Sequence, residues 1–256
     1  MLKDFLNGIS YYFKAIPKLI EFNLLKYVLL ILVLLLFYFS PFFLFGFFIS
    51  LFEKILPFNK TAYFLDLFSQ FTASISGFML LLFLSPLFSI VSEKVTERLQ
   101  GKTYKFSLKQ LIKDIIRGLK ITFRNIFYQY ILVAILYLFI FFLPENDIVP
   151  KIFSVLLAII SSYFYGFTLL DYALENQRLD YYQSVNFVRK HKGFSIGLGL
   201  VYYLVLKFNN LPFVYDIFGT NTYYVTTFLE AFLLLVGVVA ATIFVVKVHN
   251  KKAPTI

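Results

Sequence analysis

Long uncharged runs of hydrophobic residues dominate the pattern of this sequence. Residues 27–52 contain 26 consecutive residues without a charge, and residues 71–92 form a second run of 22. A helix of about 20 apolar residues crosses the hydrocarbon layer of a bilayer, because each residue adds about 1.5 Å towards about 30 Å. Such a helix also satisfies its own backbone hydrogen bonds. The two runs therefore predict a hairpin of two long transmembrane helices, the first kinked at Pro41.

The later hydrophobic runs are shorter or interrupted. Residues 126–143 and 152–170 contain 18 and 19 residues, which is marginal for a crossing, and residues 193–206 contain only 14. Residues 217–246 are hydrophobic apart from Glu230. The period-two alternation of a β-barrel is not visible. The 14-residue run therefore predicts a half-crossing, and the runs of 18 and 19 residues predict short helices that barely span the membrane or re-enter it.

The first 26 residues have an amphipathic helical pattern. Apolar side chains recur at three- and four-residue steps, with lysines between them: Leu2, Phe5, Ile9, Phe13, Ile16 and Ile20, then Lys3, Lys14 and Lys18. The apolar run that follows is longer than that of a signal peptide. We therefore interpret this segment as an uncleaved helix on the membrane surface.

Residues 93–125 are strongly basic. The region contains nine Lys or Arg residues and three acidic ones. Part of it is predicted to form a second amphipathic helix. The apolar side of this helix contains Leu108, Leu111, Ile112, Ile115, Ile116, Leu119 and Phe123, and the basic side contains Lys109, Lys113, Arg117, Lys120 and Arg124. By the positive-inside rule this region is cytoplasmic, which places the N-terminus on the same side. The basic residues after position 246 place the C-terminus there too, across an even number of crossings.

The predicted fold is all-α, a polytopic helical membrane protein. It forms one integral membrane domain over residues 1–256: an interfacial segment (1–26), a long helical hairpin (27–92), a basic cytoplasmic amphipathic region (93–125) and two short helical hairpins (126–170 and 193–246).

Composition and charge support a membrane protein. The chain is 60% hydrophobic and 15% charged, with a mean hydropathy of +0.79, which lies outside the range of soluble domains. In so apolar a chain the net charge of +10 favours contact with anionic lipids over nucleic acid. Cysteine is absent, which excludes disulfides and cysteine-based metal sites or nucleophiles.

Glu230 is the ionisable residue that stands out, because a carboxylate within a hydrophobic run is costly in hydrocarbon unless it is paired or hydrated. Three interpretations stay open: a buried pair with a basic residue such as Lys207, a helix end near the interface, or a role in an ion or proton path. Asp66 and Asp171 lie at segment margins and are predicted to be on the surface.

Small residues mark close helix contacts. Gly193 and Gly197 have GxxxG spacing in a hydrophobic segment, with Gly199 nearby, and Gly237 precedes Ala241 at the same spacing. Such spacing lets helices approach closely, so we predict helix packing here. The alternative is exposed backbone along a permeation path.

No motif in the sequence predicts catalysis, a metal or a cofactor. His191 and His249 share no ligand spacing with each other or with carboxylates. No Walker loop, GxGxxG or GxSxG is present. The sequence therefore gives an enzymatic function no support.

The order of several segments resembles the CysZ-type sulfate permeases and the related etoposide-induced protein 2.4 family. The segments are Pro17-Lys18-Leu19, SPLFSIVSEKVTERLQG at residues 85–101, the basic amphipathic region, residues 163–171, RKHKGFSIGLG at residues 189–199 and VGVVAAT at residues 236–242. The resemblance covers nearly the whole chain. It implies two long transmembrane helices with pairs of short, partly penetrating ones, in a homo-oligomer of the inner membrane.

For the permeases the resemblance also implies sulfate uptake, with anion contacts from a basic pair at the start of the first long helix. Only Lys18 carries over, because Ile20 and Glu21 occupy positions where the permeases are rich in Gly, Leu and Arg. We therefore expect a small-anion permease in which Lys18 and Lys26 gather the anion. The rival is a non-transporting scaffold or envelope factor whose basic region binds anionic lipid or a partner. A membrane enzyme ranks third, since it would need polar residues gathered at one depth.

Overall fold

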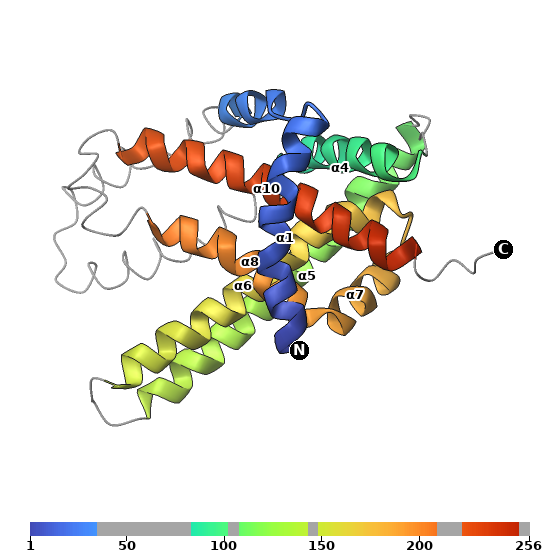
Figure 1. The fold of residues 1–256 in the computed structure, drawn as a ribbon. Helices are drawn as coiled ribbons and strands as arrows, with labels where there is room; N and C mark the ends of the chain where they lie inside the picture. Colours follow the sequence, from blue (N-terminus) through green and yellow to red (C-terminus); the bar gives the residue numbers. More distant parts are fainter. Residues whose placement is uncertain (35–82, 102–107, 143–147, 209–221, 251–256) are drawn as a thin grey trace, which may run out of the picture.

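The described part of the chain is helical throughout. The computed structural model describes residues 1–34, 83–101, 108–142, 148–208 and 222–250 (Figure 1). Its helices are α1 (Leu2–Glu21), α4 (Ser85–Gln100), α5 (Leu108–Phe141), α6 (Ile148–Asn176), α7 (Tyr181–Lys190), α8 (Lys192–Phe208) and α10 (Thr222–Asn250). A helix also covers residues 26–34. The predicted all-α fold is confirmed within these ranges, whereas the predicted long crossings at 27–52 and 71–92 lie mostly outside them.

Three described helices are long and apolar enough to cross a membrane: Ile112–Leu136, Lys151–Asn176 and Val225–Asn250. The hydrophobic run at 152–170 thus lies inside the longer α6, with 29 residues, and the run at 126–143 belongs, as far as Phe141, to α5, with 34 residues. α5 continues without a break through residue 125, where the sequence suggested a boundary between the basic region and the next hairpin. No proline interrupts residues 108–141, so the helical backbone can continue while side-chain polarity changes.

α1 has two different faces. One face, with Gly8, Tyr11, Tyr12, Ala15 and Leu19, is buried against the protein. The other leaves large apolar side chains uncovered: Leu2, Leu6, Phe13, Ile16 and Ile20. This outer face contains most of the predicted apolar stripe, so the stripe is available to lipid while a row of small and aromatic residues holds α1 on the bundle.

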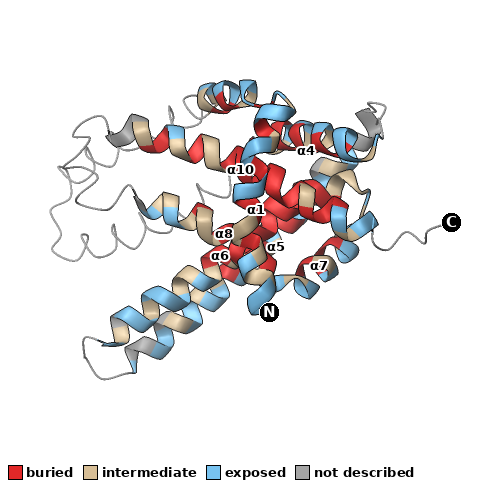
Figure 2. Cartoon of the chain, viewed as in Figure 1, coloured by how far each residue is buried: buried red, intermediate tan, exposed pale blue. Residues whose placement is uncertain are grey.

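The core of the bundle lies where α1, α6, α8 and α10 meet, and α4 packs against α6 and α10. Figure 2 shows buried residues concentrated at this centre and exposed residues along the far half of the α5–α6 hairpin. That half of the hairpin carries exposed Phe127, Ile135, Phe139, Ile152 and Val155. Apolar side chains in such an arrangement are suited to lipid or to another protein surface.

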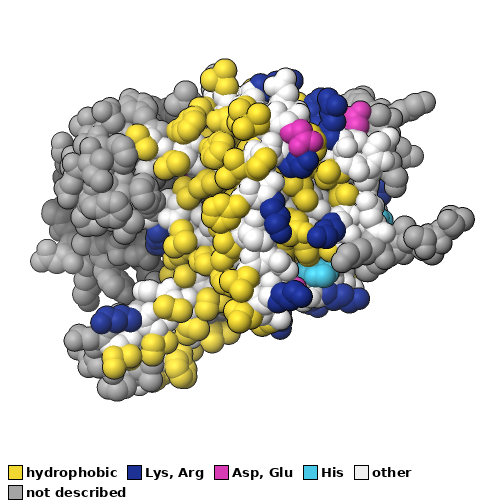
Figure 3. Space-filling view, in the orientation of Figure 1, with side chains coloured by type: hydrophobic (Ala, Val, Ile, Leu, Met, Phe, Trp, Pro, Cys, Tyr) yellow, Lys and Arg dark blue, Asp and Glu magenta, His cyan; other side chains and the backbone are white. Residues whose placement is uncertain are grey.

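Figure 3 shows the same division on the surface. Hydrophobic side chains cover α1 and the hairpin on this face, while most basic side chains gather toward the side where α4 and α7 lie. A hydrophobic surface with basic residues at one margin is typical of a membrane protein whose basic margin meets headgroups.

Candidate functional site

A cavity of about 590 Å³ lies between the turn after α1 and the C-terminal half of α4. Its lining consists of Phe22, Asn23, Lys26, Lys94, Glu97, Arg98 and Gly101. Lys94 and Arg98 are four residues apart and therefore share one face of α4. Three basic side chains against one carboxylate make this space electropositive. We call it the basic cavity.

Local backbone structure holds Lys26 at the basic cavity. Asn23 has a φ of 54°, a left-handed conformation that asparagine adopts more readily than most residues. The Leu24 N–H donates to the Leu19 carbonyl at 2.9 Å, and the Asn23 N–H donates to the Ile20 carbonyl at 3.0 Å. These two bonds form a Schellman motif, which ends α1 and turns the chain toward α4.

Lys18 lies beside the basic cavity and is not part of its lining. Its Nζ is 2.5 Å from the Glu21 carboxylate, and both side chains are partly exposed. The same Nζ lies 5.4 Å from the ring centre of Phe22, which lines the cavity. The structure therefore brings together Lys26, Lys94 and Arg98, of which sequence reasoning singled out only Lys26. The i, i+4 spacing of the other two was a usable signal, but their position next to Lys26 depends on tertiary packing.

A second group of charged residues is buried between α5, α6 and α7. Arg117 donates from Nη2 to the Asp171 carboxylate and, at 2.8 Å, to the Ser184 hydroxyl. Its Nη1 lies 3.7 Å from Glu175. Only 5% of Asp171 is exposed, so its predicted surface position is wrong: α6 continues to Asn176 and carries Asp171 into the protein. We call Arg117, Asp171, Glu175 and Ser184 the ionic cluster.

Next to the ionic cluster lies a cavity of about 260 Å³. Its polar lining comes from Ser85 and Ser89 of α4, Asp114 and Thr122 of α5, and Thr168, Asp171 and Glu175 of α6. Glu175 also accepts a hydrogen bond from the Ser89 hydroxyl at 2.7 Å. Three carboxyl groups line this space, so it is less suited to an anion than the basic cavity is.

Glu230 is buried inside α10, with 8% of its surface exposed. Its Oε1 accepts a hydrogen bond of 2.9 Å from the Tyr202 hydroxyl. Lys207, the basic partner considered from the sequence, instead has its Nζ 5.8 Å from the ring centre of Tyr203.

The glycines singled out from the sequence lie at close helix crossings. A Cβ at Gly197 would lie 2.1 Å from the Phe5 carbonyl oxygen of α1, and one at Gly193 would lie 2.5 Å from that of Met1. Gly199 faces the other way, toward the Ser162 carbonyl oxygen of α6, at 1.8 Å. Gly237 lies against the Tyr12 hydroxyl, 2.7 Å from the corresponding Cβ.

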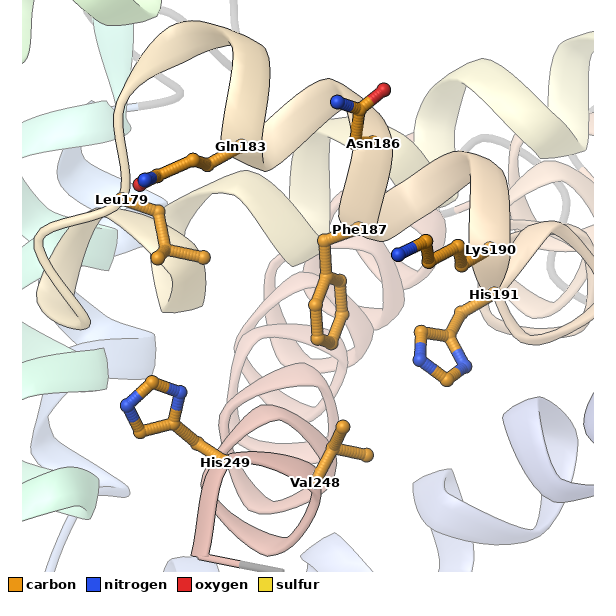
Figure 4. Close-up of a pocket in the computed structure, with 8 residues that line it drawn as sticks. All are labelled: Leu179, Gln183, Asn186, Phe187, Lys190, His191, Val248 and His249. Atoms are coloured by element: carbon orange, nitrogen blue, oxygen red, sulfur yellow. The ribbon is translucent and has the colours of Figure 1, made fainter. Parts of the chain in front are cut away.

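The two histidines lie at a third cavity, of about 340 Å³, between α7 and the end of α10. Figure 4 shows the His191 and His249 imidazoles on opposite sides of Phe187 and Val248. Within the described ranges, no group of three or more His, Cys, Asp or Glu residues could hold a metal ion.

Long apolar helices, a basic margin and buried charge clusters define this chain as a polytopic α-helical membrane protein. Residues 4–218 match the family model described as sulfate transporter CysZ/etoposide-induced protein 2.4. The match covers most of the chain, and the protein belongs to this family. No individual curated protein matches the sequence.

Proposed function

We propose that this protein is a permease for a small inorganic anion such as sulfate, and that the basic cavity gathers the anion. The observation that carries this proposal is the meeting of Lys26 with Lys94 and Arg98 around about 590 Å³ of space. Membership of a family of transporter type supports it.

The chemistry of these side chains suits a doubly charged oxyanion. Lysine ammonium groups supply compact charges, and the Arg98 guanidinium supplies a planar fork of donors that matches oxyanion geometry. Together they replace part of the hydration that an anion loses on leaving water. Glu97 lies in the same lining and lowers the net attraction, which favours release over tight retention.

Lys18 has a secondary part in this proposal. Its ion pair with Glu21 offsets its charge, so it contributes to the local field and does not contact the anion in the cavity. Substitution of Lys18 is therefore expected to weaken uptake less than substitution of Lys26.

We also propose the inner membrane as the location, with both termini in the cytoplasm. The gathering of basic side chains near α4 and α7 (Figure 3) supports this orientation. Assembly into a homo-oligomer stays a prediction from the family resemblance.

The test is uptake of radiolabelled sulfate by liposomes that contain the purified protein, measured beside protein-free liposomes. Saturable uptake above the protein-free control is the expected result. Correctly inserted protein with no such uptake, together with binding to vesicles of anionic lipid, would favour the rival function as a lipid-binding scaffold.

A further inference from the structure

The carboxyl group of Glu230 lies beside tyrosines of α6 and α8, and a third tyrosine, from α1, lies near one of them. Tyr202 of α8 donates its hydrogen bond, and the Tyr165 ring of α6 packs edge-on against Tyr202 with ring centres 5.2 Å apart. Tyr12 of α1 is near enough to Tyr202 to interact electrostatically with it. We call Glu230, Tyr202, Tyr165 and Tyr12 the tyrosine–glutamate cluster.

All members of this cluster are buried, and their described neighbours bring no positive charge. Tyr202 is fully buried, and Tyr12 and Tyr165 nearly so. Among the described residues no Lys, Arg or His makes an ion pair with Glu230. Among the described residues, the titratable groups that interact with Glu230 are the phenols of Tyr202 and Tyr165. Tyr12 interacts with Tyr202, and Tyr130 and Tyr203 interact with Tyr165.

A carboxylate in this position would carry an uncompensated charge within a helix that is apolar enough to span the membrane. An ionised carboxylate has room for about four hydrogen-bond donors, whereas Glu230 accepts one hydrogen bond from the described residues, from the Tyr202 hydroxyl. A neutral carboxyl group needs fewer partners. A phenol can donate to it or accept from it, so Tyr202 can serve either protonation state.

We infer that the tyrosine–glutamate cluster is a proton-binding site, with Glu230 as the residue that binds and releases the proton. The ionic cluster differs from it in kind, because Arg117 there supplies a compensating positive charge. Glu230 also lies beyond residues 4–218, the part that matches the family model. The inference is independent of anion transport.

Burial of the Tyr12 hydroxyl adds a second feature. It has no hydrogen-bond partner among the described residues, and burial raises the pKa of this phenol, which therefore stays protonated. It faces Gly237, two helical turns beyond Glu230 along α10. The Tyr12 phenol interacts electrostatically with Tyr202, the donor to Glu230, and so belongs to the same buried polar group.

The test is infrared spectroscopy of the purified protein in lipid, recorded as a pH titration for the wild type and for Glu230→Gln. A protonated carboxyl group has its own C=O stretching band, and subtraction removes the bands of Asp171 and Glu175. We expect the wild type to show a band at neutral pH that the variant lacks and that disappears at high pH. Equal carboxyl absorption in the two proteins would overturn the inference.

A second variant and a change of cation complete the test. Tyr202→Phe removes the hydrogen bond and is expected to shift the frequency of the Glu230 band without abolishing it, which keeps the test decisive if Glu230→Gln fails to fold. An unshifted band would contradict the assignment. The titration is expected to be the same in sodium chloride and choline chloride, and a sodium-dependent curve would replace the proton site with a sodium site. Because these readouts need no transport, their failure is distinguishable from failure of the proposed permease function.

Discussion

Arg117 is the buried cation of the ionic cluster, bound to Asp171 of α6 and Ser184 of α7. Arg117 has the spacing of a residue on the polar face of an amphipathic helix, yet it is buried and bound to Asp171. Lys120, one turn further on, is exposed. Helical periodicity assigns both to the same side of α5, and only the packing of α6 and α7 distinguishes them. Glu230 could be singled out from the sequence alone, because an acidic residue within a hydrophobic run is visible there. Its hydrogen-bond partner Tyr202 could not be predicted from the sequence.

Loss of Arg117 is predicted to destabilise the protein strongly. Arg117→Leu leaves the carboxyl groups of Asp171 and Glu175 buried without their positive partner, which typically costs about 3–5 kcal/mol. Unfolding of the purified protein in mixed micelles, followed by circular dichroism during titration with a denaturing detergent, measures the loss.

The matched control is Lys120→Leu, which removes the same charge from an exposed position on the same helix. Its effect is expected to stay within about 0.5 kcal/mol. If the two variants lost equal stability, the ionic cluster would not be a stabilising element.

At the scale of elements, glycine spacing predicted close contacts between helices but did not indicate which helices would be in contact. Gly193 and Gly197 face α1, whereas Gly199 faces Gly166 and Ser162 of α6. Gly8 and Gly166 complete these crossings, and neither belongs to a spaced glycine pair in the sequence. The packing of α1 on the bundle could also not be predicted from the sequence. The apolar stripe of α1 indicated contact with the membrane, and the face that packs on the bundle consists mostly of small and aromatic residues.

A single added methyl group at the α6–α8 crossing is predicted to destabilise the protein. In Gly199→Ala the new Cβ would meet the Ser162 carbonyl oxygen at 1.8 Å, and backbone cannot move aside as a flexible side chain does. Overpacking typically costs about 1–3 kcal/mol, and contact with backbone places this variant at the upper end. Thermal unfolding in detergent is the measurement.

Gly118→Ala is the control for this substitution. Nothing lies within 4 Å of the corresponding Cβ, so the better helix propensity of alanine is expected to raise stability by up to about 1 kcal/mol. If Gly199→Ala were as stable as Gly118→Ala, α6 and α8 would be further apart than described.

At the scale of the whole molecule, hydrophobic runs gave the class of fold, because the bilayer sets the length of a crossing. They did not give the extent of the helices. The third and fourth runs looked too short for secure crossings, yet α5 and α6 extend beyond them with charged residues at their ends. The length of an uncharged run measures only the hydrophobic part of a helix. The helix itself continues wherever its backbone hydrogen bonds can form, so it can be longer than the run. The basic cavity was unpredictable for a related reason, since it joins residues some 70 positions apart, Lys26 and Lys94.

The proposed orientation predicts a simple pattern of chemical labelling. The chain contains no cysteine, so single cysteines can be introduced without a background. Lys190→Cys, on exposed α7, is expected to react with a membrane-impermeant maleimide only when the cytoplasmic side is open to it. Ile135→Cys, exposed on the α5–α6 hairpin, is expected to resist that reagent from both sides because it faces hydrocarbon. Labelling of Lys190→Cys in intact cells would reverse the proposed topology.

The most direct test of the permease account is the sulfate concentration that half-saturates uptake into proteoliposomes, compared among wild type, Lys94→Gln and Lys120→Gln. Both variants remove one positive charge, but only Lys94 lines the basic cavity. The account predicts that Lys94→Gln raises this concentration roughly three- to tenfold, equivalent to about 0.7–1.4 kcal/mol, a range kept small because the cavity is open to solvent. Lys120→Gln should leave it unchanged. Equal values for all three proteins would contradict the assignment of the basic cavity to the anion.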